Sequence, residues 1–140
     1  MNRAVALLTF IAYVFTFIPI SAGDSAFASN LSVFSKTYIR ETGKPQVYTD
    51  TFNAPTTTGS YTLIVHNGKN GQNRVSSARI WLNDKQILGP SDFNQQVDVI
   101  TRTVTLKKTN TIKVELMSKP GSFIFVNIIG EAPAILGEQG

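Results

Sequence analysis

Hydrophobic and polar residues alternate along most of the chain from residue 31 onward, and Val, Ile, Thr, Tyr and Phe dominate the runs. Alternation places successive side chains on opposite faces, so the pattern predicts β-strands that bury one face. Gly, Pro, Asn and Asp separate the runs and are typical of turns. About eight strands are predicted, over residues 31–39, 46–52, 60–66, 74–82, 85–88, 95–106, 111–117 and 123–129.

Short strands with turn signals every 8–12 residues are typical of sandwiches and barrels. We therefore predict an all-β domain over residues 29–130, an antiparallel two-sheet β-sandwich of Ig-like or jelly-roll type. Residues 67–73 form the most polar stretch and carry two Asn/Gly turn signals, which predicts an exposed hairpin-like loop. Residues 131–140 are expected to form a flexible tail.

Three strands carry more detailed predictions. In 74–82 the alternation directs Ser76, Ala78, Ile80 and Leu82 inward, and Val75, Ser77, Arg79 and Trp81 outward. In 95–106 the apolar phase changes between residues 99 and 100, which favours a β-bulge or a strand that changes sheets. The strand 123–129 is apolar on both faces, so it is either central and covered or presents one face to a partner.

The first 28 residues follow another pattern. Arg3 precedes an uncharged apolar run from Ala4 to Ile20, and small residues follow, which is the order of regions in a secretory signal peptide. The Ala26-Phe27-Ala28 sequence favours cleavage after Ala28, and Gly23 is the earlier alternative. An uncleaved anchor is the competing interpretation, but the run is short for a membrane span and Pro19 interrupts its end. We expect a secreted protein, extracellular or periplasmic, with no membrane span after cleavage.

Composition narrows the possible functions. The net charge is +4, but the basic residues are scattered, whereas nucleic-acid binders concentrate them on one face. The chain has no cysteine, which excludes disulfides and a lipid anchor and suits bacterial export. Its single histidine, His66, has no nearby partner for metal binding or acid–base chemistry. The carboxylates that might form a glycosidase pair lie in turns and outward strand positions: Asp84, Asp92, Asp98 and Glu115. We expect no enzyme activity, cofactor, metal or nucleic-acid partner.

The stretch 76–129 resembles the second half of bacterial secreted jelly-roll and Ig-like modules. Ala78-Arg-Ile-Trp-Leu-Asn-Asp matches their hairpin pattern of alternating apolar residues before Asn-Gly, and Thr109-Asn-Thr-Ile-Lys-Val matches the start of a late strand after Gly-Asn. Asn83-Asp84 and Thr109-Asn110 depart from those turns but keep turn-forming residues. The resemblance covers about half of the predicted mature chain and implies a module similar to adhesion or sugar-binding domains, without indicating any site residue.

Candidate ligand-binding residues are the outward aromatic Trp81 with its neighbour Arg79, and the tyrosines Tyr38 and Tyr48. An exposed aromatic ring stacks on sugars or marks an interface; the alternative is that Phe34 or Tyr38 covers Trp81. The leading interpretation is a secreted, non-catalytic structural or protein-interaction module at the bacterial cell surface or in the extracellular space, with a protein partner or self-association. The alternative is a carbohydrate-binding module that stacks a glycan on Trp81.

Overall fold

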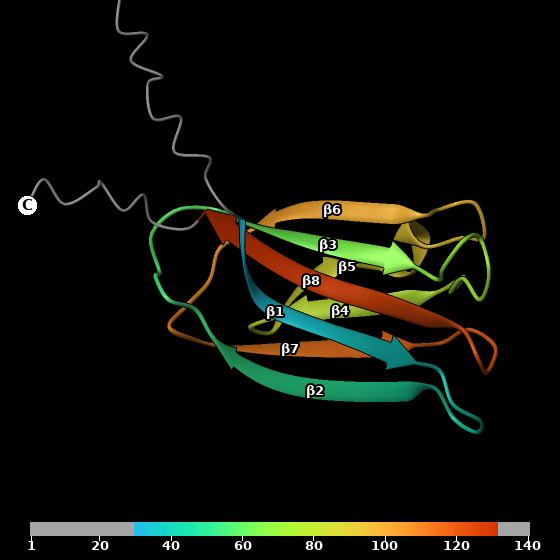
Figure 1. The fold of residues 1–140 in the computed structure, drawn as a ribbon. Coiled ribbons are helices and arrows are strands. Elements are labelled where there is room, and N and C mark those ends of the chain that lie inside the picture. Colours follow the sequence, from blue (N-terminus) through green and yellow to red (C-terminus); the bar gives the residue numbers. More distant parts are fainter. Residues whose placement is uncertain (1–29, 132–140) are drawn as a thin grey trace, which may run out of the picture.

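A computed structural model describes residues 30–131, and these form two antiparallel four-stranded sheets packed face to face (Figure 1). The first sheet has the order β1-β8-β3-β6, with bounds Asn30–Ile39, Phe123–Glu131, Tyr61–Asn67 and Val99–Val104. The second sheet has the order β2-β7-β4-β5, with bounds Gln46–Asn53, Thr109–Leu116, Ala78–Leu82 and Lys85–Leu88. A short 3-10 turn, Pro90–Asp92, follows β5. The predicted all-β, two-sheet antiparallel sandwich is confirmed.

The core lies between the sheets and is built by strict alternation. On β3, Tyr61, Leu63 and Val65 are buried, and the same period of two continues on β4, β7 and β8. The fully buried aliphatic residues include Ile80, Ile112, Val114, Leu116, Ile124, Val126 and Ile128. Burying one such side chain stabilises the fold by about 1.5–3 kcal/mol, so these residues fix which face of each strand points inward.

The strand β4 is shorter than the predicted strand, and this reverses two expectations. Val75 is fully buried although it was expected to face outward, and Ser76 is exposed although it was expected in the core. Regular pairing begins only at Ala78. The Asn67 side chain binds the backbone of Val75 at both its N–H and its C=O, so a side-chain contact, not strand alternation, sets the direction of residue 75.

The prediction of a bulge or a change of sheet within 95–106 is also wrong, because β6 stays in the first sheet. The strand β6 begins at Val99 and pairs with β3 without a register shift from Val99 to Val104. The apolar phase changes because Val97 belongs to a loop and Val99 is an apolar residue on the exposed face of β6, whereas Ile100 points into the core. Irregular pairing occurs instead between Ser32 and Phe34 on β1, and between Ile80 and Trp81 on β4.

The polar loop after β3 was predicted only in part. A tight turn closes it, because Lys69 and Gln72 exchange two backbone hydrogen bonds, with Asn70 and Gly71 at φ 53° and 73°. Positive φ at both central residues matches an Asn-Gly hairpin turn. Asn67, however, is fully buried and Gly68 is buried as well, so the exposed part of the loop starts at Lys69.

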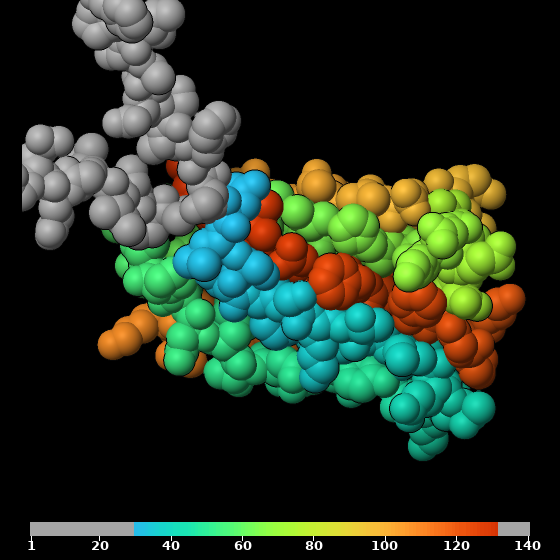
Figure 2. All heavy atoms as spheres, in the orientation of Figure 1, coloured from blue at the N-terminus to red at the C-terminus, as the bar shows by residue number. Residues whose placement is uncertain are grey.

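The strand β8 lies between β1 and β3, and its inner face is covered by the second sheet. Its outer face carries Phe123, Phe125 and Ile129, which are partly exposed. Figure 2 shows β8 atoms, in red, open at the surface between β1 and β3. The strand continues through Glu131, which pairs with Asn30 at the start of β1. The predicted signal peptide and residues 132–140 of the predicted tail lie outside the described residues.

Candidate functional site

Trp81 lies on the outer face of the second sheet and is partly exposed. Its strand pairs place it opposite Lys113 on β7 and Gln86 on β5, and Thr49 on β2 continues the same row. The Lys113 ammonium lies 4.9 Å from the centre of the Trp81 ring system, which is a cation–π contact. The ring therefore forms the apolar centre of a row of hydrogen-bonding side chains.

Arg79 lies beside Trp81 on the same face. Its Nη1 donates to Oε1 of Glu115 at 2.7 Å and contacts the Sδ of Met117 at 3.4 Å. Val47, 50% exposed, pairs with Glu115 from the edge strand β2. The outer face of the second sheet thus combines one aromatic ring, one ion pair and an exposed aliphatic residue.

The two tyrosines are not on this face. Tyr38 is fully buried between the sheets, and its hydroxyl donates to Oδ2 of Asp50 at 2.8 Å. Tyr48 packs against it with ring centroids 5.3 Å apart, and its hydroxyl donates to the carbonyl of Ile39 at 2.6 Å. Burial raises the pKa of both hydroxyls, and the Asp50 carboxylate raises that of Tyr38 further. The structure brings Trp81 and Arg79 together and places Tyr38 and Tyr48 apart from them.

Neither aromatic residue expected to cover Trp81 does so. Tyr38 points into the core, and the Phe34 ring packs on Phe52 with centroids 4.9 Å apart. Lys113 is a neighbour of Trp81 that the sequence alone does not reveal, since only the pairing of β4 with β7 brings the two together. The alternation along its strand directs Lys113 outward, but the strand that it pairs with cannot be read from the sequence.

A basin of about 460 Å³ opens on the outer face of the first sheet. Phe123 and Phe125 from β8 line it together with His66, and the loop after β3 contributes Lys69. The His66 and Phe125 rings lie 5.9 Å apart. His66 is exposed at the end of β3, as expected for a surface residue. The basin joins an apolar wall to a charged rim.

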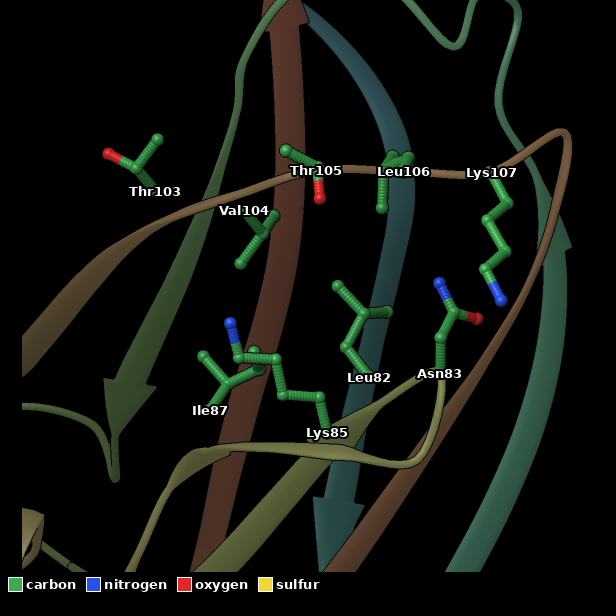
Figure 3. Close-up of a pocket in the computed structure, with 9 residues that line it drawn as sticks. All are labelled: Leu82, Asn83, Lys85, Ile87, Thr103, Val104, Thr105, Leu106 and Lys107. Atoms are coloured by element: carbon green, nitrogen blue, oxygen red, sulfur yellow. The ribbon is translucent and has the colours of Figure 1, made fainter.

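A second cavity of about 310 Å³ lies between the turn that joins β4 to β5 and the connection from β6 to β7 (Figure 3). Leu82, Val104 and Leu106 form its floor and are almost fully buried. Lys85 and Lys107 flank it from the two sides in Figure 3. This cavity was not predicted, because its residues come from segments about 20 positions apart in the sequence.

Within residues 30–131, no cluster of three or more His, Asp or Glu side chains is arranged to hold a metal ion. The same residues contain no helix with the length and apolar character needed to cross a bilayer.

No protein-family model matches the chain. No curated protein matches it either. Among solved structures, it is similar to a family 35 carbohydrate-binding module from Clostridium thermocellum, with 18% identity and a TM-score of 0.47 over 75% of this chain and all of that one. A family 35 module from an environmental isolate is 19% identical, with a TM-score of 0.32 over 74% of this chain and 73% of that one. The sandwich fold itself is established by the two sheets of the chain described above.

Proposed function

We propose that this protein is a non-catalytic carbohydrate-binding module that stacks a sugar ring on Trp81. The observation that carries the proposal is a single aromatic ring in the middle of an open sheet face, surrounded by side chains that donate and accept hydrogen bonds. Sugar rings present one apolar C–H face and a rim of hydroxyls, so they need this combination. Thr49 and Gln86 lie in the same row as Trp81 and would meet the hydroxyl rim.

The Lys113 ammonium over the ring is compatible with stacking. An exposed cation–π contact contributes about 0.5–1 kcal/mol. A sugar that removes on the order of 100 Å² of apolar surface from water would gain about 2.5 kcal/mol. Displacing Lys113 from the ring therefore costs less free energy than stacking of the sugar contributes. After displacement, the ammonium donates hydrogen bonds to hydroxyls at the rim of the bound ring.

The carboxylates support a binding role in place of glycoside hydrolysis. Asp92 pairs with Arg102, Asp98 with Arg74 and Glu115 with Arg79, at 2.9, 3.1 and 2.7 Å. Each of these three carboxylates therefore already has one oxygen engaged by a guanidinium, whereas hydrolysis needs two carboxyl groups that face the scissile bond together. Asp84 is exposed in the turn between β4 and β5, where its φ is 66°.

A glycan array followed by fluorescence titration tests the proposal. Trp81 is the only tryptophan, so its emission reports the proposed site without interference. A bound sugar is expected to shift this emission saturably, and Trp81→Ala is expected to abolish retention on the same glycan. Phe125→Ala removes a partly exposed aromatic residue from the opposite sheet and serves as the matched control. Unchanged glycan binding by Trp81→Ala, with the control also unchanged, would refute the proposal.

Protein association is the second candidate function, and the outer face of the first sheet favours it. Ile39 and Val99 are 49% and 46% exposed there, beside the partly exposed Phe123 and Phe125 on β8. Size-exclusion chromatography with light scattering tests for self-association, which Val99→Asp should then abolish. A strict monomer that retains no partner in pull-downs counts against this candidate.

Both candidates include export. The predicted signal peptide would release a soluble module outside the cytoplasm, extracellular or periplasmic, after cleavage at Ala28. Mass spectrometry of the secreted protein would read the new N-terminus directly. Ser29 is expected there, Asp24 would indicate the earlier cleavage point, and an intact Met1 would contradict processing.

A further inference from the structure

The cavity in Figure 3 combines an apolar floor with two cations that have no partner in the described structure. Leu82, Val104 and Leu106 are 4–5% exposed and face the cavity together with Ile87. Lys85 and Lys107 line it as well. Among residues 30–131 the four ion pairs involve other basic residues, so neither lysine is neutralised by a carboxylate.

The direction of the two lysine side chains is informative. In Figure 3, the Lys85 ammonium lies beside Ile87 and Val104, and the Lys107 ammonium lies beside Asn83, so the two ammonium groups stand at opposite ends of the cavity. A lysine beside apolar surface ordinarily lays its methylenes on that surface and directs its ammonium to water. Two ammonium groups at the rim of one apolar cavity create a region of positive potential above it.

The polar atoms at the rim restrict what can bind. The Asn83 amide is already used, because its Nδ2 donates to Oδ1 of Asn110 and its Oδ1 accepts from the backbone N–H of Thr111. The Thr105 hydroxyl points toward the cavity in Figure 3. The available groups are therefore two ammonium donors and one hydroxyl.

We propose that this cavity binds a small organic carboxylate, with its apolar body on Leu82, Val104 and Leu106 and its carboxylate at the Lys85 end or the Lys107 end of the cavity. Hydrogen bonds between an ammonium and a carboxylate are about twice as strong as neutral ones. A monoanion suits the site better than a phosphate dianion, since a second charge beside the apolar floor would lose its hydration. The volume is at the lower end for ligand pockets, about 300–1,000 Å³, so the body is the size of one six-membered ring.

This proposal is independent of sugar binding at Trp81. Trp81 and Leu82 are consecutive residues on β4, so they project to opposite faces of the second sheet. The hairpin of β4 and β5 therefore contributes to both sites, with the Trp81 platform outside the sheet and the cavity beneath it. Loss of one activity need not affect the other.

Benzoate is a suitable probe, with methyl-detected NMR of the purified secreted protein as the measurement. Saturable shifts are expected at the methyl groups of Leu82, Val104 and Leu106, with Kd in the millimolar range that a ligand of this size allows. Benzamide keeps the ring and removes the charge, and acetate keeps the charge and removes the ring. Both are expected to bind at least about tenfold more weakly than benzoate.

The double substitution Lys85→Gln/Lys107→Gln is expected to raise the Kd for benzoate at least about tenfold. Lys69→Gln/Lys119→Gln removes the same charge from exposed positions elsewhere and should leave the Kd within about twofold. An equal rise in the benzoate Kd of this control variant would show that only the net charge of the protein matters, and it would overturn the proposal. Equal binding of benzamide, or benzoate binding that survives Lys85→Gln/Lys107→Gln, would also overturn it. If the variant without the two lysines misfolds, salt provides the test in the unmodified protein. A benzoate Kd that does not rise with added salt would then overturn the proposal.

Discussion

Replacing Asn67 with alanine tests how the loops at one end of the sandwich are held. Asn67 is fully buried at the end of β3. Its Nδ2 lies 2.9, 3.2 and 3.1 Å from the carbonyl oxygens of Val75, Asn94 and Val97, and its Oδ1 accepts from the N–H of Val75 at 2.7 Å. One amide therefore joins the end of β3 to the loop that follows it and to a second loop 27–30 residues further along the chain.

The expected cost follows from these contacts. Asn67→Ala leaves the buried N–H of Val75 without its acceptor, which costs about 1–3 kcal/mol. The carbonyl groups lose their donor, at about 0.5–1.5 kcal/mol for each hydrogen bond. Because an NH₂ group has two protons, the three carbonyl contacts amount to about two bonds. We expect a loss of about 2–6 kcal/mol, a large part of the roughly 5–15 kcal/mol that stabilises a typical domain.

Urea denaturation followed by circular dichroism measures this loss, and the emission of Trp81 provides a second probe. Asn53→Ala is the matched control, because Asn53 is exposed on the edge strand β2 and accepts one hydrogen bond from Thr109. It should change the free energy of unfolding by no more than about 0.5–1 kcal/mol. A loss below about 1 kcal/mol for Asn67→Ala, or one equal to the control, would refute the reasoning.

Three further predictions concern packing and titration. Gly130→Ala should lower the free energy of unfolding by about 1–3 kcal/mol, because a Cβ there would lie 2.5 Å from Cε1 of Tyr61. The loss should be smaller in a Tyr61→Leu background, and an unchanged loss in this double-mutant cycle would contradict the steric explanation. Burial opposes ionisation of Asp50, but hydrogen bonds from Lys36 and Tyr38 outweigh it and lower its pKa. Its contribution to stability is therefore present above the pKa of an unfolded aspartate and lost as pH falls through the lower folded pKa; Asp50→Asn should flatten this part of the stability profile, and an unchanged acid limb would contradict the assignment. Tyr38→Phe removes one of these donors and should raise the Asp50 pKa, which NMR titration of the carboxyl carbon measures, with Tyr48→Phe as the control.

The sequence predicts the parts of this fold that repeat locally. The inward phase of Tyr61, Leu63 and Val65 can be read directly, because strand alternation alone sets it. The direction of Val75 cannot be read in this way, because it depends on a hydrogen bond from Asn67, eight residues earlier. Asn67 itself looks like the start of a polar turn, and nothing in its neighbours indicates burial.

The difference between local strand alternation and contacts between distant segments also explains which parts of the candidate site were predicted. Trp81 was predicted to face outward, and it does so because β4 pairs with β7 in regular register from Ala78 onward. Tyr38 and Tyr48 were grouped with it by residue type, but β1 and β2 direct both rings between the sheets, where their hydroxyls find partners. The contact with Lys113 and the cavity between Lys85 and Lys107 depend on strand order, which residue patterns along the chain do not encode.

The two proposed sites can be separated because the hairpin of β4 and β5 divides them. Trp81→Ala acts outside the second sheet and should leave benzoate shifts at the methyl group of Val104 unchanged. The lysine substitutions act at the cavity and should leave the glycan titration of Trp81 fluorescence unchanged. If each variant removed both activities while the protein stayed folded, the hairpin would have to be coupling one site to the other. The consecutive placement of Trp81 and Leu82 on opposite faces of a packed sheet argues against such coupling.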